Sequence, residues 1–451
     1  MATRPAMAHT APPRPAPSSP APPRRILLVD ADAFFVAVAR MVDPEGAGKA
    51  RLLIVGGAPG SRGVVCSASY ETRQYGVRSA MPIARAMRLC PQAMCVPVPR
   101  GACGRKSREI AAVLQRFAPV VQAASIDEWY LDLTGTEALY RGAPLDDVAH
   151  RIRDAVHQAT GLSVSLGGGT NKLVAKLAVE FAKPRPGTDG TGVCIVPPGE
   201  EARFLQQVPL ADIPGVGPRL RDRLQALGLR TVPDVTGAGL AALERMLGER
   251  AGQWLFDRAR GIGSTEVVAR ERPKSVSHED TFPHDLDDDA ALEAELVRLV
   301  TRVASDLRAR GLAARTISVK LKDADFRLRG ASRTLDAPVV ADRVIRAIAR
   351  ELLQRLRAAR RIPARLLGVG LSGLGESEEA DQLSLFGEES APAERETARD
   401  RALATAVDQL RARFGSAAIV PGRLAVRAPN AARAGEAPPP APGRGARPSD
   451  R

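Results

Sequence analysis

The sequence predicts an α+β protein with several domains, and three observations lead to this assignment. The chain has 451 residues, 44% of them hydrophobic, which is enough for two to four domains with cores of their own. The apolar segment Ile26–Val29 has the pattern of a buried strand. Residues 273–371 carry strand and helix patterns in the order βαββαβ, which is typical of a ferredoxin-like split unit.

The first strand runs directly into acidic residues. Asp30 follows Val29, so we expect it at the carboxyl end of that strand, and Asp32 comes two residues later. Asp32 could simply cap the helix that is expected to begin near Ala33. Asp30 has no comparable structural role, and it is therefore the stronger candidate for a functional residue.

A second acidic pair lies between two apolar segments. Residues 118–124 and 129–133 flank Asp127 and Glu128, which predicts a hairpin with these acids at its tip. Adjacent side chains on a regular strand point to opposite faces, so the two acids can share a ligand only if the backbone bends there. For an isolated pair, a solvated turn would be the ordinary explanation. Together with Asp30, however, the pair would form an oxygen site suited to two magnesium ions and to phosphoryl transfer.

The motifs around these acids resemble those of the Y-family translesion DNA polymerases, and most closely the bacterial DinB type, DNA polymerase IV. The resemblance covers about residues 24 to 374, and its motifs follow one another in the family's order. They are Val29–Phe35, Tyr70–Arg73, Ser79–Pro82, Ser125–Glu128, Asn171–Lys176, Ile213–Gly217, Lys274–Ser277 and Leu366–Val369. Each motif is weak alone, but so many in a fixed order are specific.

The resemblance implies roles for individual residues. Asp30, Asp127 and Glu128 would be the catalytic ligands of two Mg²⁺ ions, and the carbonyl group of Ala31 would complete one of the metal sites. Phe35 would be the steric gate, an aromatic ring that leaves no room for a 2′-hydroxyl group on the incoming nucleotide. The residues that would hold this nucleotide are Phe34, Phe35, Tyr70, Arg73 and Lys172.

The resemblance also implies a right-hand fold with a palm, small fingers, a helical thumb and a little finger domain. The thumb would contain a helix-hairpin-helix motif. The expected boundaries are 1–23 for a disordered Pro/Ala-rich tail, 24–36 and 97–187 for the palm, 37–96 for the fingers, 188–262 for the thumb, 263–272 for a linker, 273–374 for the little finger, and 375–451 for a second disordered tail.

Charge points to DNA as the partner. The net charge is +14, and residues 301–370 hold 17 Lys and Arg against 6 Asp and Glu. Lys320 and Lys322 alternate with apolar residues on a predicted strand, so both would lie on its exposed face, where they could contact DNA phosphates. Gly215 and Gly217 lie in a turn whose backbone N–H groups could bind another phosphate, although a Gly-x-Gly turn alone is a weak signal.

The acidic stretch from residue 376 to 389 contains an apolar peptide, residues 382–386. It resembles the short peptide with which bacterial proteins bind the sliding clamp, and its candidate contact residues are Gln382, Leu383, Leu385 and Phe386. A chance apolar patch in a polar tail is the alternative.

We therefore predict a translesion DNA polymerase that uses Mg²⁺, deoxynucleoside triphosphates and primed template DNA, with low fidelity and without proofreading. No signal peptide or membrane span is expected, and five cysteines without a pairing or metal pattern suggest a reduced, cytoplasmic protein. Nothing in the sequence suggests more than a monomer. The main alternative is a Y-family adaptor that has lost catalysis, although all three acids are present here. A second alternative is another palm-type nucleotidyl transferase, such as a cyclase.

Three departures from the family's usual pattern touch none of the expected ligands. Ala39 stands where a glutamate is common, and Thr72 replaces an alanine. Three glycines, Gly167–Gly169, precede the motif that begins at Asn171, where the family typically has fewer. We expect these changes to affect fidelity or rigidity.

Overall fold

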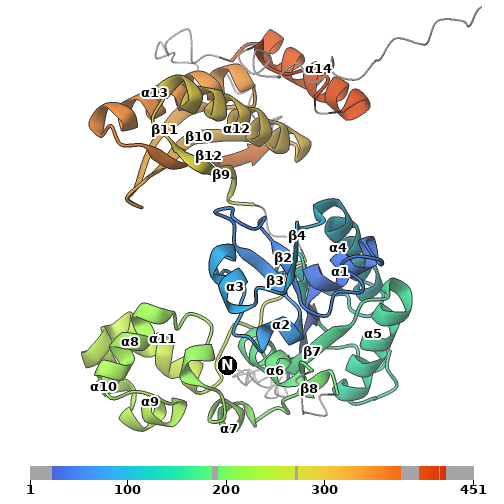
Figure 1. Cartoon of the computed structure of the whole chain (residues 1–451). Coiled ribbons are helices and arrows are strands. Elements are labelled where there is room, and N and C mark those ends of the chain that lie inside the picture. The colour runs from blue at the N-terminus through green and yellow to red at the C-terminus, as the bar shows by residue number, and fades with distance from the viewer. Residues whose placement is uncertain (1–22, 185–190, 270–272, 377–395, 416, 423–451) are drawn as a thin grey trace, which may run out of the picture. The chain divides into compact units, whose positions relative to one another are not determined.

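The structure is a computed structural model that describes residues 23–184, 191–269, 273–376, 396–415 and 417–422 (Figure 1). The chain divides into two compact units, residues 1–271 and residues 272–451, which are described separately below. Both units mix helices with sheets whose strands are largely antiparallel, so the predicted α+β class is confirmed.

A five-stranded sheet forms the centre of the first unit, with the strand order β5-β6-β1-β7-β8. Its strands are β1 (Ile26–Ala31), β5 (Val120–Ala123), β6 (Glu128–Asp132), β7 (Val164–Gly169) and β8 (Val193–Ile195). All six residues of β1 are buried, as its continuous apolar sequence predicts for a strand covered on both faces.

Helices cover both faces of this sheet. Alternate residues of β1, Leu27 and Val29, pack against α4 (Arg100–Leu114) and α5 (Leu145–Thr160). The residues between them, Ile26 and Leu28, pack against α6 (Lys172–Ala182). The strand period of two therefore places the core residues of β1 in two separate clusters.

The glycines before Asn171 belong to strand β7 and allow α6 to lie directly on it. A Cβ atom on Gly167 would lie 2.2 Å from the backbone nitrogen of Val179 and 2.3 Å from the carbonyl oxygen of Ala175. The helix runs antiparallel to the strand, because Gly169 faces Val174 near the start of α6. This glycine run is thus a requirement of packing rather than a loosening of a loop.

A smaller three-stranded sheet follows β1 and α1 (Phe34–Val42) in the chain. Its strand order is β3-β2-β4, from β2 (Leu53–Gly56), β3 (Val65–Ala68) and β4 (Met94–Val96), with α2 (Tyr70–Arg73) and α3 (Ile83–Leu89) in the connections. Thr72, one of the departures noted above, is fully buried, and its hydroxyl lies 2.8 Å from the Ser69 hydroxyl.

The rest of the first unit is helical apart from β8. It contains α7 (Glu201–Leu205), the 3₁₀ helix η1 (Leu210–Asp212), α8 (Pro218–Ala226), α9 (Val232–Ala238), α10 (Leu240–Leu247) and α11 (Glu249–Ala259). These helices share one apolar cluster, which reaches α6 through residues such as Leu177.

The second unit is built on a four-stranded sheet with the strand order β11-β10-β12-β9. Its elements are β9 (Ser275–Leu286), α12 (Asp289–Ala309), β10 (Leu312–Asp323), β11 (Leu328–Val339), α13 (Asp342–Ala359) and β12 (Ala364–Glu376). The predicted order βαββαβ is therefore confirmed. Helices α12 and α13 cover one face of the sheet, where they bury Ile317, Val319 and Leu321 of β10.

The second unit differs from the prediction after residue 374. Strand β12 extends to Glu376, and α14 (Ala398–Phe414) lies in a region that the sequence assigns to a disordered tail. In Figure 1 this helix lies beside the layer formed by α12 and α13. The expectation of a tail without secondary structure over residues 375–451 was wrong for this helix.

Candidate active site

Strands β1 and β6 bring the predicted acids together at one end of the sheet. The two strands are antiparallel neighbours, and Asp30 is paired directly with Glu128. Asp127 lies in the turn just before β6, where its carbonyl oxygen accepts a hydrogen bond of 2.9 Å from the N–H group of Ala31. The predicted hairpin with acids at its tip is thus formed by β5 and β6.

Each of the three carboxylates has its own hydrogen-bond donor. Lys183 Nζ lies 3.0 Å from Asp30 Oδ2, and Lys176 donates to Glu128. The hydroxyl group of Ser125 donates to the carboxylate of Asp127. Among the residues that the structure describes, no three acidic, His or Cys side chains are close enough together to hold a metal ion as they stand.

The donor set nevertheless fits a hard divalent cation. Carboxylate oxygens and a backbone carbonyl group are the ligands that Mg²⁺ prefers in proteins. Strand pairing already brings the backbones of Asp30, Asp127 and Glu128 together. The lysines beside these acids show that the site already attracts positive charge.

Burial strongly affects Asp30, of which only 7% is exposed. Burial raises the pKa of its carboxyl group to about 7, although Lys183 opposes this change and Glu128 adds to it. A buried carboxylate of this kind is stabilised by any cation that approaches it.

Asp32 does not cap the following helix, so that explanation is wrong. Helix α1 begins after Ala33, which has a φ of 44°, and no side chain caps it. Asp32 Oδ1 instead accepts a hydrogen bond of 2.7 Å from the hydroxyl group of Ser165 on β7. Burial raises the pKa of Asp32 as well. Asp32 therefore faces the same region as Asp30 and adds negative charge to it.

The two adjacent phenylalanines of α1 have different surroundings. Phe34 is 2% exposed and belongs to the core, so its ring has no access to a ligand and only its backbone could contact a nucleotide. Phe35 is half-buried, and its ring lies edge-on to that of Phe34 with the centroids 5.5 Å apart. Of the two rings, only that of Phe35 can reach a bound molecule.

The guanidinium group of Arg73 lies close to the acidic residues. The guanidinium carbon of Arg73 lies 4.9 Å from the centroid of the Tyr70 ring, at the start of the short helix α2. Burial raises the pKa of Tyr70 to about 12, Asp32 adds to this effect, and Arg73 and Lys183 oppose it. The Tyr70 hydroxyl group thus stays protonated at neutral pH and can donate to an anion.

Lys172, which the sequence predicts as a nucleotide ligand, lies elsewhere. Its Nζ atom donates a hydrogen bond of 2.8 Å to Gln122 Oε1 and lies 4.7 Å from the centroid of the Tyr130 ring. Helix α6 begins at Lys172 near the end of β7 that pairs with Ile26, whereas Asp30 is at the other end of β1.

Lys183 is the residue that the sequence reasoning missed. Because α6 runs back along β7, its C-terminal end returns to the end of the sheet where Asp30 lies. Pro184 stops the helix at this point, since proline cannot continue it, and Lys183 remains beside the carboxylate. A lysine that directly precedes a proline at the end of this helix was the signal that could have identified it.

The predicted thumb motif has the expected backbone geometry. Gly215 lies in the turn between η1 and α8 with a φ of 104°, and a Cβ atom there would lie 2.5 Å from the ring of Trp254. Gly217 precedes the first turn of α8, where Pro218 occupies the first helical position. The turn therefore requires a glycine at position 215, and it exposes the N-terminal N–H groups of α8.

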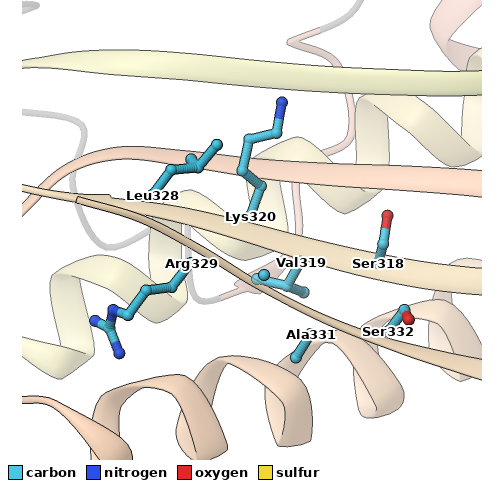
Figure 2. A pocket seen from close by; sticks show the side chains of 8 residues that line it. Ser318, Val319, Lys320, Leu328, Arg329, Ala331 and Ser332 are labelled. Carbon is cyan, nitrogen blue, oxygen red and sulfur yellow. The ribbon is translucent and has the colours of Figure 1, made fainter. Parts of the chain in front are cut away.

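The face of the second sheet opposite α12 and α13 carries the predicted lysines. Lys320 and Ser318 point away from the helices, and Lys320 Nζ donates a hydrogen bond of 2.8 Å to Glu279 Oε2 (Figure 2). A hollow of about 420 Å³ is lined by residues of β10 and β11, among them Ser318, Lys320 and Leu328 (Figure 2). Lys322, two residues along β10, has the same orientation by strand period and is half-buried.

Two expectations concern other parts of the chain. The apolar peptide at residues 382–386, with Gln382, Leu383, Leu385 and Phe386, lies outside the described residues. None of the helices in the described part of the chain is long and apolar enough to cross a membrane.

Comparisons with protein families agree with this arrangement. Residues 29–180 match the impB/mucB/samB family, and residues 273–385 match the C-terminal domain of that family. Residues 211–263, which include the turn at Gly215, match the thumb domain of DNA polymerase-iota.

Individual relatives agree across most of the chain. The DNA polymerase IV of Alkalilimnicola ehrlichii is 39% identical over 80% of this chain and 99% of its own length. The DNA polymerase IV of Caulobacter vibrioides is 37% identical over 88% of this chain and 93% of its own length.

Solved structures lead to the same family. A Y-family DNA polymerase chimera of Dbh and Dpo4 superposes with a TM-score of 0.68 at 26% identity, over 77% of this chain and 98% of the chimera. The insertion ternary complex of Dbh DNA polymerase gives a TM-score of 0.55 at the same identity and coverage. The chain therefore belongs to the Y-family DNA polymerases of the DinB type, and it is a DNA-directed DNA polymerase of the translesion kind.

Proposed function

We propose that Asp30, Asp127 and Glu128, together with the carbonyl group of Ala31, hold two Mg²⁺ ions and catalyse nucleotide addition to a primer. The observation that carries this proposal is the direct pairing of Asp30 with Glu128 across β1 and β6. Next to this pair, the backbone of Asp127 is hydrogen-bonded to that of Ala31. A pair of bound Mg²⁺ ions would activate the primer 3′-hydroxyl group and offset the charge of the pyrophosphate leaving group.

The protein's own contribution is to gather and orient negative charge in a buried place. Asp30 is held by β1 in the centre of the sheet, so it cannot move far without disrupting the core. Lys183 and Lys176 neutralise Asp30 and Glu128 here, and bound cations would take over this role. The lysines are then free to turn toward the phosphate groups of the substrate.

Tyr70, Arg73 and Lys183 are the side chains that we assign to the triphosphate. Arg73 offers a planar fork of donors, Lys183 a point charge and Tyr70 a hydroxyl donor on a rigid ring. All three lie near the acidic end of β1, because the charges of Asp32, Arg73 and Lys183 all affect the pKa of Tyr70. Phe35 would lie beneath the sugar as the steric gate.

The first prediction separates the two lysines at the ends of α6. Changing Lys183 to glutamine should raise the KM for deoxynucleotides by about 10-fold to 100-fold, because a hydrogen bond to a charged group contributes about 1.5–3 kcal/mol. Lys172→Gln is the matched control, and it should change this KM by no more than about twofold, as expected for a side chain outside the site. Steady-state single-nucleotide insertion measures both values. A larger effect in Lys172→Gln than in Lys183→Gln would contradict this prediction and support Lys172 as the nucleotide ligand.

Primed template DNA and deoxynucleoside triphosphates are the substrates that we assign to this enzyme. The relatives include ternary complexes of Dbh DNA polymerase, which supports the same substrates here. Template DNA would lie against the turn at Gly215 and Gly217 and against the lysines of β10, Lys320 and Lys322. We infer that the enzyme works as a monomer in the cytoplasm.

Low fidelity without proofreading follows from the same assignment. The segment that would cover the new base pair is a three-stranded sheet with two short helices, and we propose that four small residues leave this cover open. They are Gly63, Ser67, Ala68 and Ser69. A small cover constrains the nascent base pair weakly. Base pairing with the template would therefore mainly decide which nucleotide is inserted.

Primer extension by the unmodified protein tests this function. On an undamaged primed template with deoxynucleotides and Mg²⁺, we expect short, distributive products that disappear when the metal is chelated. An adaptor without catalysis would bind the same DNA but would give no products at any Mg²⁺ concentration.

We also propose that residues 382–386 bind the bacterial sliding clamp. The peptide has two leucines and a phenylalanine within an acidic stretch, a composition that suits docking into an apolar groove on a partner. The second prediction is that deleting these five residues abolishes stimulation by a loaded clamp while leaving distributive synthesis intact. Extension assays with and without the clamp and its loader would show this, and stimulation that survives the deletion would contradict the proposal.

A further inference from the structure

Helix α14 is fixed to the second unit by its acidic residues. Asp408 accepts a hydrogen bond of 2.7 Å from Arg308 of α12, and Asp400 accepts two, of 2.8 Å and 2.9 Å, from Arg343 of α13. Just before the helix, the carboxylate of Glu396 accepts hydrogen bonds from the N–H groups of Val340 and Ala341.

These last contacts lie at the start of α13, which has no side-chain cap of its own. The N-cap residue of α13 is Ala341, whose side chain cannot accept a hydrogen bond. Glu396, 55 residues further along the chain, instead accepts from the N–H groups of Ala341 and of the preceding Val340, and its side chain is only 4% exposed. The start of α14 is therefore anchored on the second unit.

A different face of α14 carries an exposed apolar ridge. Leu403 is 63% exposed, Leu410 is 40% exposed and Phe414 is 62% exposed. Leu410 and Phe414 follow Leu403 by seven and eleven positions, so the three side chains align along one side of the helix. The helix is held through Asp400 and Asp408, and the only residue of the described helix that is fully buried is Ala404, so the ridge lies outside this contact.

Positive charge borders the ridge. Arg399 and Arg413 are exposed and lie beside it by helical spacing, and the guanidinium carbon of Arg413 lies 5.1 Å from the centroid of the Phe414 ring. A partner that fits this surface should therefore combine a few large apolar side chains with acidic flanks.

The stretch that links β12 to α14 has this composition. Residues 377–395 contain six Asp and Glu against one Arg, and their only large apolar side chains are Leu383, Leu385 and Phe386. Residues 423–451, the other stretch outside the described residues that adjoins α14, hold six Arg against two acids. Like charges would oppose its binding to a ridge bordered by arginines.

The distances permit this contact. Phe386 and Glu396 are ten positions apart, so the peptide can reach up to about 33 Å from that anchor. The ridge begins at Leu403 and ends at Phe414, which is about 27 Å along a helix from the position of Glu396. The peptide can therefore reach the whole ridge without disturbing the anchored start of α14.

We propose that, in the free enzyme, residues 382–386 pack against the ridge formed by Leu403, Leu410 and Phe414. The acidic residues on either side of the peptide face Arg399 and Arg413. This inference rests on the proposed clamp function. It adds that the clamp must displace α14 from Leu383, Leu385 and Phe386 before it can bind them. Helix α14 thereby sets how readily the enzyme is recruited.

Hydrogen exchange on the full-length protein tests the contact without using the clamp. In the wild type, the amides of residues 382–386 should exchange several-fold more slowly than in the triple variant Leu403→Ser, Leu410→Ser, Phe414→Ser. The matched control is Ala402→Ser with Ala412→Ser, which changes exposed positions outside the ridge and should leave the exchange of residues 382–386 as in the wild type. Unchanged exchange of the α14 amides shows that the helix remains docked in each variant.

Clamp affinity gives the second readout. If the peptide is masked about 90% of the time, the triple variant should bind the clamp about tenfold more tightly than the wild type. Equal exchange of residues 382–386 in wild type and triple variant would overturn the contact, and so would a wild-type dimer that the triple variant converts to a monomer, because a second copy would then occupy the ridge. Protection without any change in clamp affinity would overturn the regulatory role. Failure of the deletion experiment above would refute clamp binding but not the exchange result.

Discussion

Replacing Asp127 with alanine should abolish primer extension while leaving DNA binding intact. Asp127 contributes a carboxylate at the point where β1 and β6 bring Asp30 and Glu128 together. Loss of a ligand that supplies several kcal/mol of charge stabilisation should lower the extension rate by about 10³-fold or more, since each factor of ten corresponds to roughly 1.4 kcal/mol. Single-turnover extension on a primed template, with a binding assay in parallel, measures both properties.

The matched control for Asp127→Ala is Ser125→Ala in the same turn. The Ser125 hydroxyl donates to the Asp127 carboxylate, so its removal perturbs the turn without removing a proposed metal ligand. We expect this variant to lose about 10-fold to 100-fold in extension rate, less than Asp127→Ala, because a hydrogen bond to a charged group contributes about 1.5–3 kcal/mol. Equal losses in both variants would mean that the turn's conformation, rather than the carboxylate, is what catalysis requires.

Replacing Phe35 with alanine should raise ribonucleotide insertion by about 100-fold or more relative to deoxynucleotide insertion. The ring of Phe35 is half-buried, and its edge-on contact with the core residue Phe34 holds it in a fixed position. A rigid ring beneath the sugar excludes a 2′-hydroxyl group by steric overlap, whereas alanine leaves space for it. The measurement is the ratio of kcat/KM values for the two sugars with the same base.

Phe35→Tyr serves as the control, because it keeps the ring and should keep the discrimination. Phe35 also packs against core residues around α1, so the alanine variant will lose some stability. Deoxynucleotide insertion by Phe35→Ala reports whether the site remains folded. If that insertion persists and the sugar ratio is unchanged, Phe35 is not the gate.

The sequence predicted those parts of the structure that apolar patterns define. The buried apolar run before Asp30 and the hairpin pattern around Asp127 predicted the two strands that build the site, β1 and β6. The alternation of apolar and polar residues in 316–322 predicted strand β10. Strand pairing then explains why acids almost 100 residues apart meet. Their side-chain partners could not be predicted, because the choice between Lys172 and Lys183 depends on the direction in which α6 returns along β7.

Helix α14 was missed for a different physical reason. It attaches to the second unit through Asp400 and Asp408, and acidic side chains in a polar stretch are read as solvated surface. Its large apolar residues, such as Leu403, lie on an exposed face, so their periodicity did not indicate a core contact. Asp32 illustrates the same limit, because its partner Ser165 is 133 residues away.

The strand order of the second unit has a consequence for how the protein is made on the ribosome. Strand β12 lies between β9 and β10, so β9 has no partner in the sheet until the last strand, which ends at Glu376, has been synthesised. A nascent chain that stalls earlier would have a complete catalytic sheet but an unpaired strand edge, which favours aggregation and proteolysis. Late closure of this sheet would thus favour accumulation of the polymerase together with the unit that we propose to hold it on DNA.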